Sequence, residues 1–134
     1  MLLQILDWLQ SHEDSHYADE LGSLKLSPPT HIFELQDGLE LEFGDETVQV
    51  FYPGPAHTPD NVVVYFPDRK LLFGGCMIIR WDQIGNRSDA DLDSWPVSVK
   101  SLSQFDVNIL VPGHGDRLDP ALIEDTLQLL DAGK

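Results

Sequence analysis

The sequence predicts a single α/β domain of the α+β kind, in which about three helices combine with one sheet. Short runs such as "LELEF" and "VVVYF" recur between turn residues, which is typical of strands. Segments at the start and the end of the chain repeat apolar residues at helical spacing. The length of 134 residues suits one domain, and we place it at residues 1–134.

The first part of the chain is expected to hold one helix and three strands. The helix covers residues 2–10, where the apolar residues fall on one helical face. The strands are "HIFEL" (31–35), "LELEF" (39–43) and "TVQVFY" (47–52), and Gly44-Asp45 turns the chain between the last two.

The second part is expected to add three strands and two helices. The strands are "NVVVYF" (61–66), "KLLFGG" (70–75) and "VNILV" (107–111). A helix is predicted over residues 91–105, capped by Ser88 or Asp89. The last helix is capped by Asp119, with Pro120 at its first position and Gly133 near its end.

Three of the strands are apolar at successive residues, which predicts burial on both faces of the sheet. Two helices can cover one face. The other face needs a cover, and we expect either a homodimer through this uncovered face or the N-terminal helix folded over it. A monomer without such a cover would expose a large apolar patch.

Composition and charge exclude several classes of partner. The chain has 8 basic and 23 acidic residues and a net charge of −15, which opposes binding to nucleic acid or to an anionic membrane surface. No run approaches the length of a membrane span, and the start has neither a basic leader nor a cleavage site for a signal peptide. A cytoplasmic location is therefore expected for the sequence as given.

Three loops each present a side chain that can bind zinc. They are "PGPAHTPDN", "FGGCMIIR" and "VPGHGD", and they carry His57, Cys76 and His114. Each loop ends a strand, where sites collect in α/β sheets. The alternatives are a buried, inert thiol at Cys76 and loop histidines that bond only to backbone. The polar cluster "HEDSH" (12–16) and His31 are expected to have no chemical role.

The order and spacing of "FYPGPAHTPDNVVVYFPDRKLLFGGCMI", "GNRSDADLDSWP" and "VPGHGD" resemble the dizinc metallo-β-lactamases. The resemblance implies the C-terminal half of an αββα sandwich with a mostly antiparallel sheet. It assigns His57 to a three-histidine zinc site, and Cys76 and His114 to a second zinc site. Asn86 falls where relatives place an asparagine near the substrate carbonyl. Full-length relatives are typically periplasmic.

The sequence also departs from this family. It lacks the His-x-His-x-Asp motif, which supplies ligands to both zinc ions. The lysine that often binds the substrate carboxylate is replaced by Ile79, so Arg80 or Arg87 would have to take that role. We therefore expect one zinc ion or none, with His57, Cys76 and His114 as its ligands.

The functions implied are of two kinds. The first is a zinc hydrolase of β-lactams or other small amides or esters, weak or inactive because half of the ligands are missing. The second is a non-catalytic relic or an interaction module, stabilised by self-association or by docking on a separate N-terminal half.

Overall fold

The computed structural model describes residues 27, 29–80, 84–85 and 87–133. The chain divides after Ile32, and the unit Phe33–Lys134 is described here by itself. The first predicted helix and the "HEDSH" cluster lie outside the described residues. Whether residues 1–134 form one domain stays a prediction.

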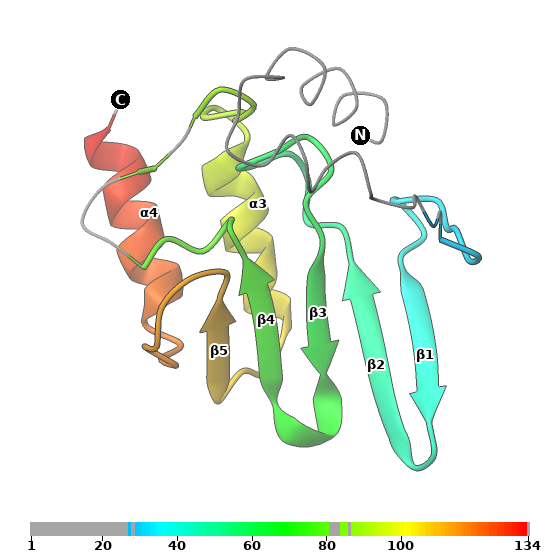
Figure 1. Ribbon diagram of the computed structural model, residues 1–134. Helices are drawn as coiled ribbons and strands as arrows, with labels where there is room; N and C mark the ends of the chain where they lie inside the picture. The colour runs from blue at the N-terminus through cyan, green and yellow to red at the C-terminus, as the bar shows by residue number, and fades with distance from the viewer. Residues whose placement is uncertain (1–26, 28, 81–83, 86, 134) are drawn as a thin grey trace, which may run out of the picture. The chain divides into compact units, whose positions relative to one another are not determined.

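The unit is built on one five-stranded sheet in the order β1-β2-β3-β4-β5 (Figure 1). Neighbouring strands are antiparallel, except that β4 and β5 are parallel. The strands are β1 Leu39–Phe43, β2 Glu46–Phe51, β3 Val63–Phe66, β4 Leu71–Gly75 and β5 Ile109–Pro112. The predicted mixed α+β class with a mostly antiparallel sheet is confirmed.

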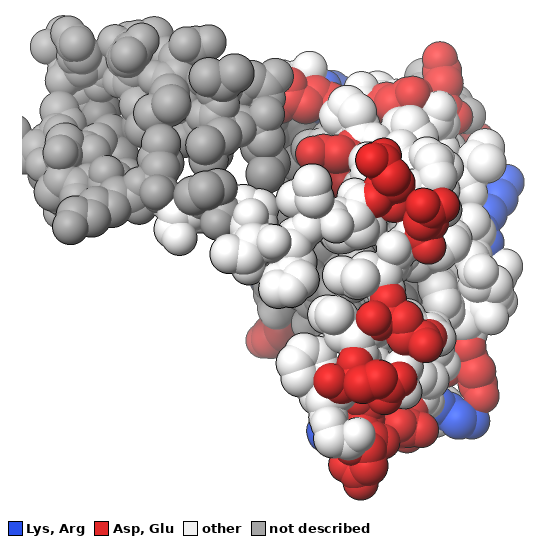
Figure 2. All heavy atoms as spheres, turned by 90° about the vertical axis from the view of Figure 1, so that its right-hand side faces the viewer, with Lys and Arg blue, Asp and Glu red and all other residues white. Residues whose placement is uncertain are grey.

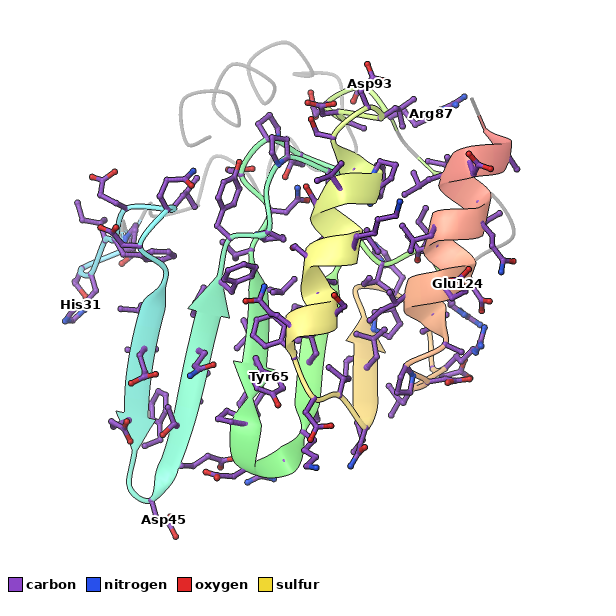
Figure 3. The ribbon with its side chains drawn as sticks, turned by 180° about the vertical axis from the view of Figure 1, so that it is seen from behind. His31, Asp45, Tyr65, Arg87, Asp93 and Glu124 are labelled. Carbon is purple, nitrogen blue, oxygen red and sulfur yellow. The ribbon has the colours of Figure 1, made fainter. Side chains whose placement is uncertain are left out.

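Two α-helices, α3 (Trp95–Ser101) and α4 (Leu122–Ala132), lie on the same face of the sheet (Figures 1 and 3). Short 3₁₀ helices, η1 (Pro67–Arg69) and η2 (Leu102–Gln104), follow β3 and α3. Alternate strand residues point toward the α-helices and form the core with them. Its fully buried members include Val63, Leu72, Leu110, Trp95, Val99 and Leu122. No helix in the described part of the chain is both long and apolar enough for a membrane span.

The prediction of a strand at residues 31–35 is wrong. Ile32 is 88% exposed, and the chain then turns. The backbone N–H groups of Asp37 and Gly38 donate to the carbonyls of Glu34 and Leu35, and Gly38 has a φ of +65°. These local hydrogen bonds use the groups that a strand would offer to a neighbour. The other five predicted strands form, with ends shifted by a few residues.

The helix predicted over residues 91–105 is shorter than expected. The Asp91 carboxylate accepts the backbone N–H of Ser94 at 2.8 Å, so residues 92–94 form a turn. The α-helix begins at Trp95 and continues as η2, which ends where Phe105 becomes extended. The cap is therefore neither Ser88 nor Asp89. In the last helix, Asp119 does accept a backbone N–H, that of Ala121 at 2.9 Å, and α4 starts just after it.

Burial on both faces of the strands is also wrong for the described unit. Of the strand residues that point away from the α-helices, Val48 is buried and the others are half-buried or exposed, with Phe73 at 42% and Phe43 at 63% exposure. The sheet therefore has one covered face and one open face. The register places these apolar residues on the open face: Leu39, Leu41, Phe43, Val48, Val50, Val64, Phe66, Leu71, Phe73, Ile109 and Val111.

Candidate functional site

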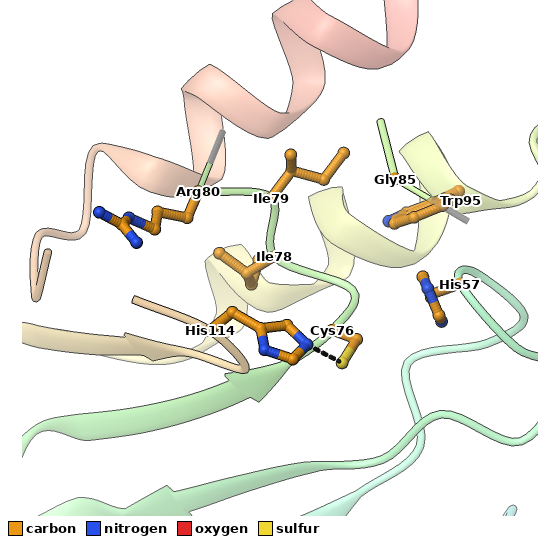
Figure 4. Close-up of a pocket in the computed structure, with 8 residues that line it drawn as sticks. All are labelled: His57, Cys76, Ile78, Ile79, Arg80, Gly85, Trp95 and His114. Atoms are coloured by element: carbon orange, nitrogen blue, oxygen red, sulfur yellow. Dashed lines mark hydrogen bonds between the residues drawn. The ribbon is translucent and has the colours of Figure 1, made fainter. Parts of the chain in front are cut away.

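Three loops lie at the same end of the sheet, because β2, β4 and β5 run in the same direction and each loop follows the carboxyl end of its strand. The loop after β2 carries His57, the loop after β4 carries Cys76, and the loop after β5 carries His114. All three side chains line one pocket of about 270 Å³ (Figure 4). The remaining lining residues are Ile78, Ile79, Arg80, Gly85 and Trp95.

Cys76 and His114 are in direct contact. The Sγ of Cys76 lies 3.5 Å from Nε2 of His114. The two loops approach closely because the Gly113 N–H donates to the Gly75 carbonyl at 2.8 Å. A Cβ on Gly113 would lie 2.7 Å from the Cys76 backbone nitrogen, which only glycine avoids. Cys76 is exposed, so the alternative of a buried, inert thiol is wrong.

The His57 loop is held by α3 and the turn before it. The Ser98 hydroxyl donates to the Pro55 carbonyl at 2.6 Å, and the Asp91 N–H donates to the Ala56 carbonyl at 2.8 Å. A Cβ on Gly54 would lie 2.7 Å from the Ser98 Oγ, so a side chain there would push the loop away. Hydrogen bonding within the loop, from the Tyr52 hydroxyl to the Pro59 carbonyl at 2.8 Å, completes its anchoring.

Trp95 contacts two of the three loops. Its Nε1 donates to the Met77 carbonyl at 2.8 Å, and its ring meets that of His57 edge to face, with centroids 5.7 Å apart. Sequence reasoning missed Trp95 and Ser98 as site residues. One signal was present: Trp95 lies within the family motif "GNRSDADLDSWP", and Ser98 follows three residues later on the buried face of the same helix.

The predicted substrate-binding residues occupy different places. Arg80 lines the pocket, but its guanidinium points away from Cys76 and His57 (Figure 4) and pairs with Asp116 at 3.3 Å. Arg87 is exposed on the segment before α3 and is not a lining residue (Figure 3). Asn86 lies outside the described residues. Substrate binding by any of them stays a prediction.

The donor set fits zinc in part. Two ligands at about 2.3 Å and 2.0–2.1 Å from a tetrahedral zinc lie about 3.5 Å apart, which is the separation of the Cys76 and His114 atoms. His57 lines the same pocket. Within the described residues, however, no three His, Cys, Asp or Glu side chains are grouped closely enough to hold a metal ion. Cys76 and His114 are therefore spaced as two ligands of one zinc ion, whereas His57 lies further from this pair.

The same fold and site order occur in known proteins. The family model of the metallo-beta-lactamase superfamily matches residues 4–114. The chain belongs to the metallo-beta-lactamase superfamily. It is 36% identical to a metallo-beta-lactamase type 2 of Pseudomonas aeruginosa over 125 residues, which are 90% of this chain and 50% of that protein.

Solved metallo-beta-lactamases share the fold. The enzyme from Pontibacter korlensis is 39% identical, with a TM-score of 0.67 over 70% of this chain and 46% of its own. DIM-1, a metallo-beta-lactamase exposed to ceftazidime, is 38% identical, with a TM-score of 0.64 over 71% of this chain and 45% of its own. The chain thus spans about half the length of the relatives it matches.

Proposed function

We propose that this chain carries the cysteine-containing part of a zinc hydrolase site, and that its own hydrolysis of β-lactams or related amides and esters is weak or absent. The observation that carries this proposal is the Cys76–His114 pair, whose 3.5 Å separation suits two ligands of one tetrahedral zinc. Family membership supports the reaction class.

The residues of the chain would each do a limited task. Cys76 and His114 would hold one zinc ion, with His57 as a third ligand if the two sides of the pocket approach. Zinc, when bound, would act as a Lewis acid that polarises a carbonyl and activates water. Ile78, Ile79 and Trp95 supply apolar walls for a ligand. Arg80 could bind a substrate carboxylate after leaving Asp116, which is a weak partner because it is 94% exposed.

Weak or absent activity follows from what the described residues do not supply. A catalytic zinc site normally has three protein ligands, each oriented by further hydrogen bonds. Here two ligands are placed together and the third is not. An ion bound by this pair, which His57 reaches only when the two sides of the pocket approach, is loosely positioned, and the substrate carbonyl is then poorly aligned with it.

The test combines zinc content with turnover. After dialysis with zinc, we expect one ion per chain, lost in Cys76→Ala, and ceftazidime hydrolysis far below ordinary enzyme rates of about 1–10³ s⁻¹. Absence of bound zinc would reject the site. Hydrolysis at ordinary rates, abolished by a chelator and by Cys76→Ala, would reject the claim of weak activity.

The open face of the sheet favours a second candidate function, an interaction module that binds a second copy of this chain. The strand residues on that face are apolar, apart from Glu46 at one end, while Glu40 and Glu42 point to the other side. The sheet measures roughly 24 Å by 16 Å from strand spacing and rise, or roughly 400 Å² of flat area. Two copies packed face to face would bury about twice this flat area, without counting the added surface of the protruding side chains. This is near the lower limit of specific interfaces, at about 1,000 Å².

Face-to-face packing suits this chain better than pairing of strand edges. Figure 2 looks onto the edge formed by β1, where acidic side chains run down the surface. Glu40 and Glu42 on this strand are exposed. Two such edges would bring like charges together, which discourages edge pairing. The apolar face carries little charge, so a net charge of −15 opposes face packing less strongly.

A further inference from the structure

We propose that Trp95 is a positioning residue that sets the distance and orientation of His57 relative to the Cys76–His114 pair. This inference rests on the proposed zinc site. Trp95 is 1% exposed and contacts both sides of the pocket. Its indole N–H binds the Cys76 loop through the Met77 carbonyl, and its ring holds the His57 ring edge to face at an interplanar angle of 89°.

The two sides of the pocket need such a link because the sheet does not provide one. Cys76 and His114 follow adjacent parallel strands, and the Gly113–Gly75 hydrogen bond joins their loops directly. His57 follows β2, which is separated from β4 by β3. Two strand spacings amount to roughly 9–10 Å. Backbone pairing therefore fixes one pair of ligands and leaves the third at a distance that other contacts must set.

Helix α3 and the turn before it supply those contacts. Ser98 and Asp91 hold the main chain of the His57 loop through the Pro55 and Ala56 carbonyls. These bonds fix where the loop runs, whereas Trp95 touches the His57 ring itself. An edge-to-face ring pair has a preferred geometry and adds about 0.5–1.5 kcal/mol beyond burial. Trp95 thus contacts the His57 ring and also binds the Cys76 loop.

The hydrogen bond to Met77 makes the link specific to tryptophan. Met77 is 1% exposed, so its carbonyl has little access to water when the indole N–H is removed. In Trp95→Phe a ring still fills much of the space, but the Cys76 loop loses its bond to α3. We expect that loop to relax away from the His57 side of the pocket.

The experiment is a double-mutant cycle on Co²⁺ binding by the full chain, followed by absorption. Cobalt reports a bound thiolate and its coordination number through its absorption bands. We expect Trp95→Phe and His57→Ala each to weaken Co²⁺ binding by about 10–100-fold. The double variant should be no weaker than either single one, because both changes remove the same ligand. Effects that add, or Trp95→Phe binding equal to that of the unchanged chain, would overturn the proposal.

A matched control separates positioning from general destabilisation. Phe105 is a half-buried aromatic residue packed against the core, with ring centroids 5.4 Å from Phe51 and 4.7 Å from Tyr65. Phe105→Leu should lower the unfolding midpoint without changing the cobalt spectrum. A cobalt spectrum altered equally by Phe105→Leu would assign the Trp95 effect to stability alone.

A measurement on the metal-free chain keeps this proposal distinct from the zinc site. If the unchanged chain binds no Co²⁺, the proposed function fails, but the ring contact is still testable by proton NMR. The His57 ring resonances should shift in Trp95→Phe because the facing ring changes, while those of the exposed His31 stay in place. Unchanged His57 resonances would reject the positioning role.

Discussion

The Sγ atom of Cys76 and the Nε2 atom of His114 lie 3.5 Å apart at the carboxyl ends of two adjacent parallel strands. This spacing arises from the main chain. Parallel pairing of β4 with β5 brings the two loops to the same end of the sheet, and glycine at position 113 lets their backbones come into contact. The pair is therefore built into the fold of this half-length chain.

Zinc should stabilise the folded chain through this pair. A ligand that binds only the native state adds about 2.7 kcal/mol at a concentration of 100 times its Kd. We expect the thermal midpoint to rise with added zinc, and to rise less at lower pH because protons compete for the ligands. Cys76→Ser should abolish the rise. The control is His31→Ala, which alters an exposed histidine outside the pocket and should retain it.

Gly113→Ala should separate the pair. The new Cβ would lie 2.7 Å from the Cys76 nitrogen and the Gly75 carbonyl carbon, both of them backbone atoms that cannot swing away. We expect a loss of about 1–3 kcal/mol in unfolding free energy, as for overpacked sites, together with loss of zinc binding. Urea unfolding and zinc titration measure the two effects. Gly85→Ala is the matched control in the same pocket, since its Cβ would meet nothing within 4 Å; an equal effect there would contradict the steric explanation.

Asp91 should make stability depend on pH on the acid side. The backbone N–H of Ser94 holds the pKa of this carboxylate below its usual value. The stabilisation is then complete above the unfolded-state value of about 4 and is lost as the pH falls through the lower folded-state pKa. We expect Asp91→Ala to lower the free energy of unfolding at pH 7. Below about pH 4, this free energy should fall less steeply in the variant than in the unchanged chain. Urea midpoints from pH 7 to pH 3 measure this change, and an unchanged acid limb would contradict it.

The sequence predicted the sheet well because its strands carry a strong signal. Apolar runs in "VVVYF" and "LLF" supply the residues of the helix-covered face, whereas alternation in "LELEF" puts its apolar residues on the open face, and both patterns are properties of each segment. The strand at 31–35 failed because local hydrogen bonds in the turn at Glu34–Gly38 override the propensity of "HIF". The predicted start of the helix was wrong because the Asp91 side chain accepts the backbone N–H of Ser94, which forms a turn before α3.

The candidate site was predictable only as a set of loops. Histidine and cysteine beside glycine and proline indicated His57, Cys76 and His114. The common direction of β2, β4 and β5 explains why these residues lie at the same end of the sheet. The spacing between them depends on tertiary contacts that no short motif encodes. Trp95 and Ser98 act from α3, about forty residues further along the chain than the His57 loop that they hold.

Self-association through the open face gives the last prediction. Phe73 lies near the middle of that face, opposite Val64, and is 42% exposed. A carboxylate placed there would have to be buried unpaired in a face-to-face dimer, which is costly. We expect the unchanged chain to dimerise as its concentration rises in sedimentation experiments, weakly because the face is small, and Phe73→Glu to remain monomeric. Val97→Glu is the control, because Val97 is an apolar residue on α3 that is 68% exposed; this variant should dimerise normally.

A monomer at every concentration that binds no hydrophobic dye would show that the face is covered within the chain. A separate partner that stays bound through purification and is lost in Phe73→Glu would show that the occupant is not a second copy, and either result would reject the dimer.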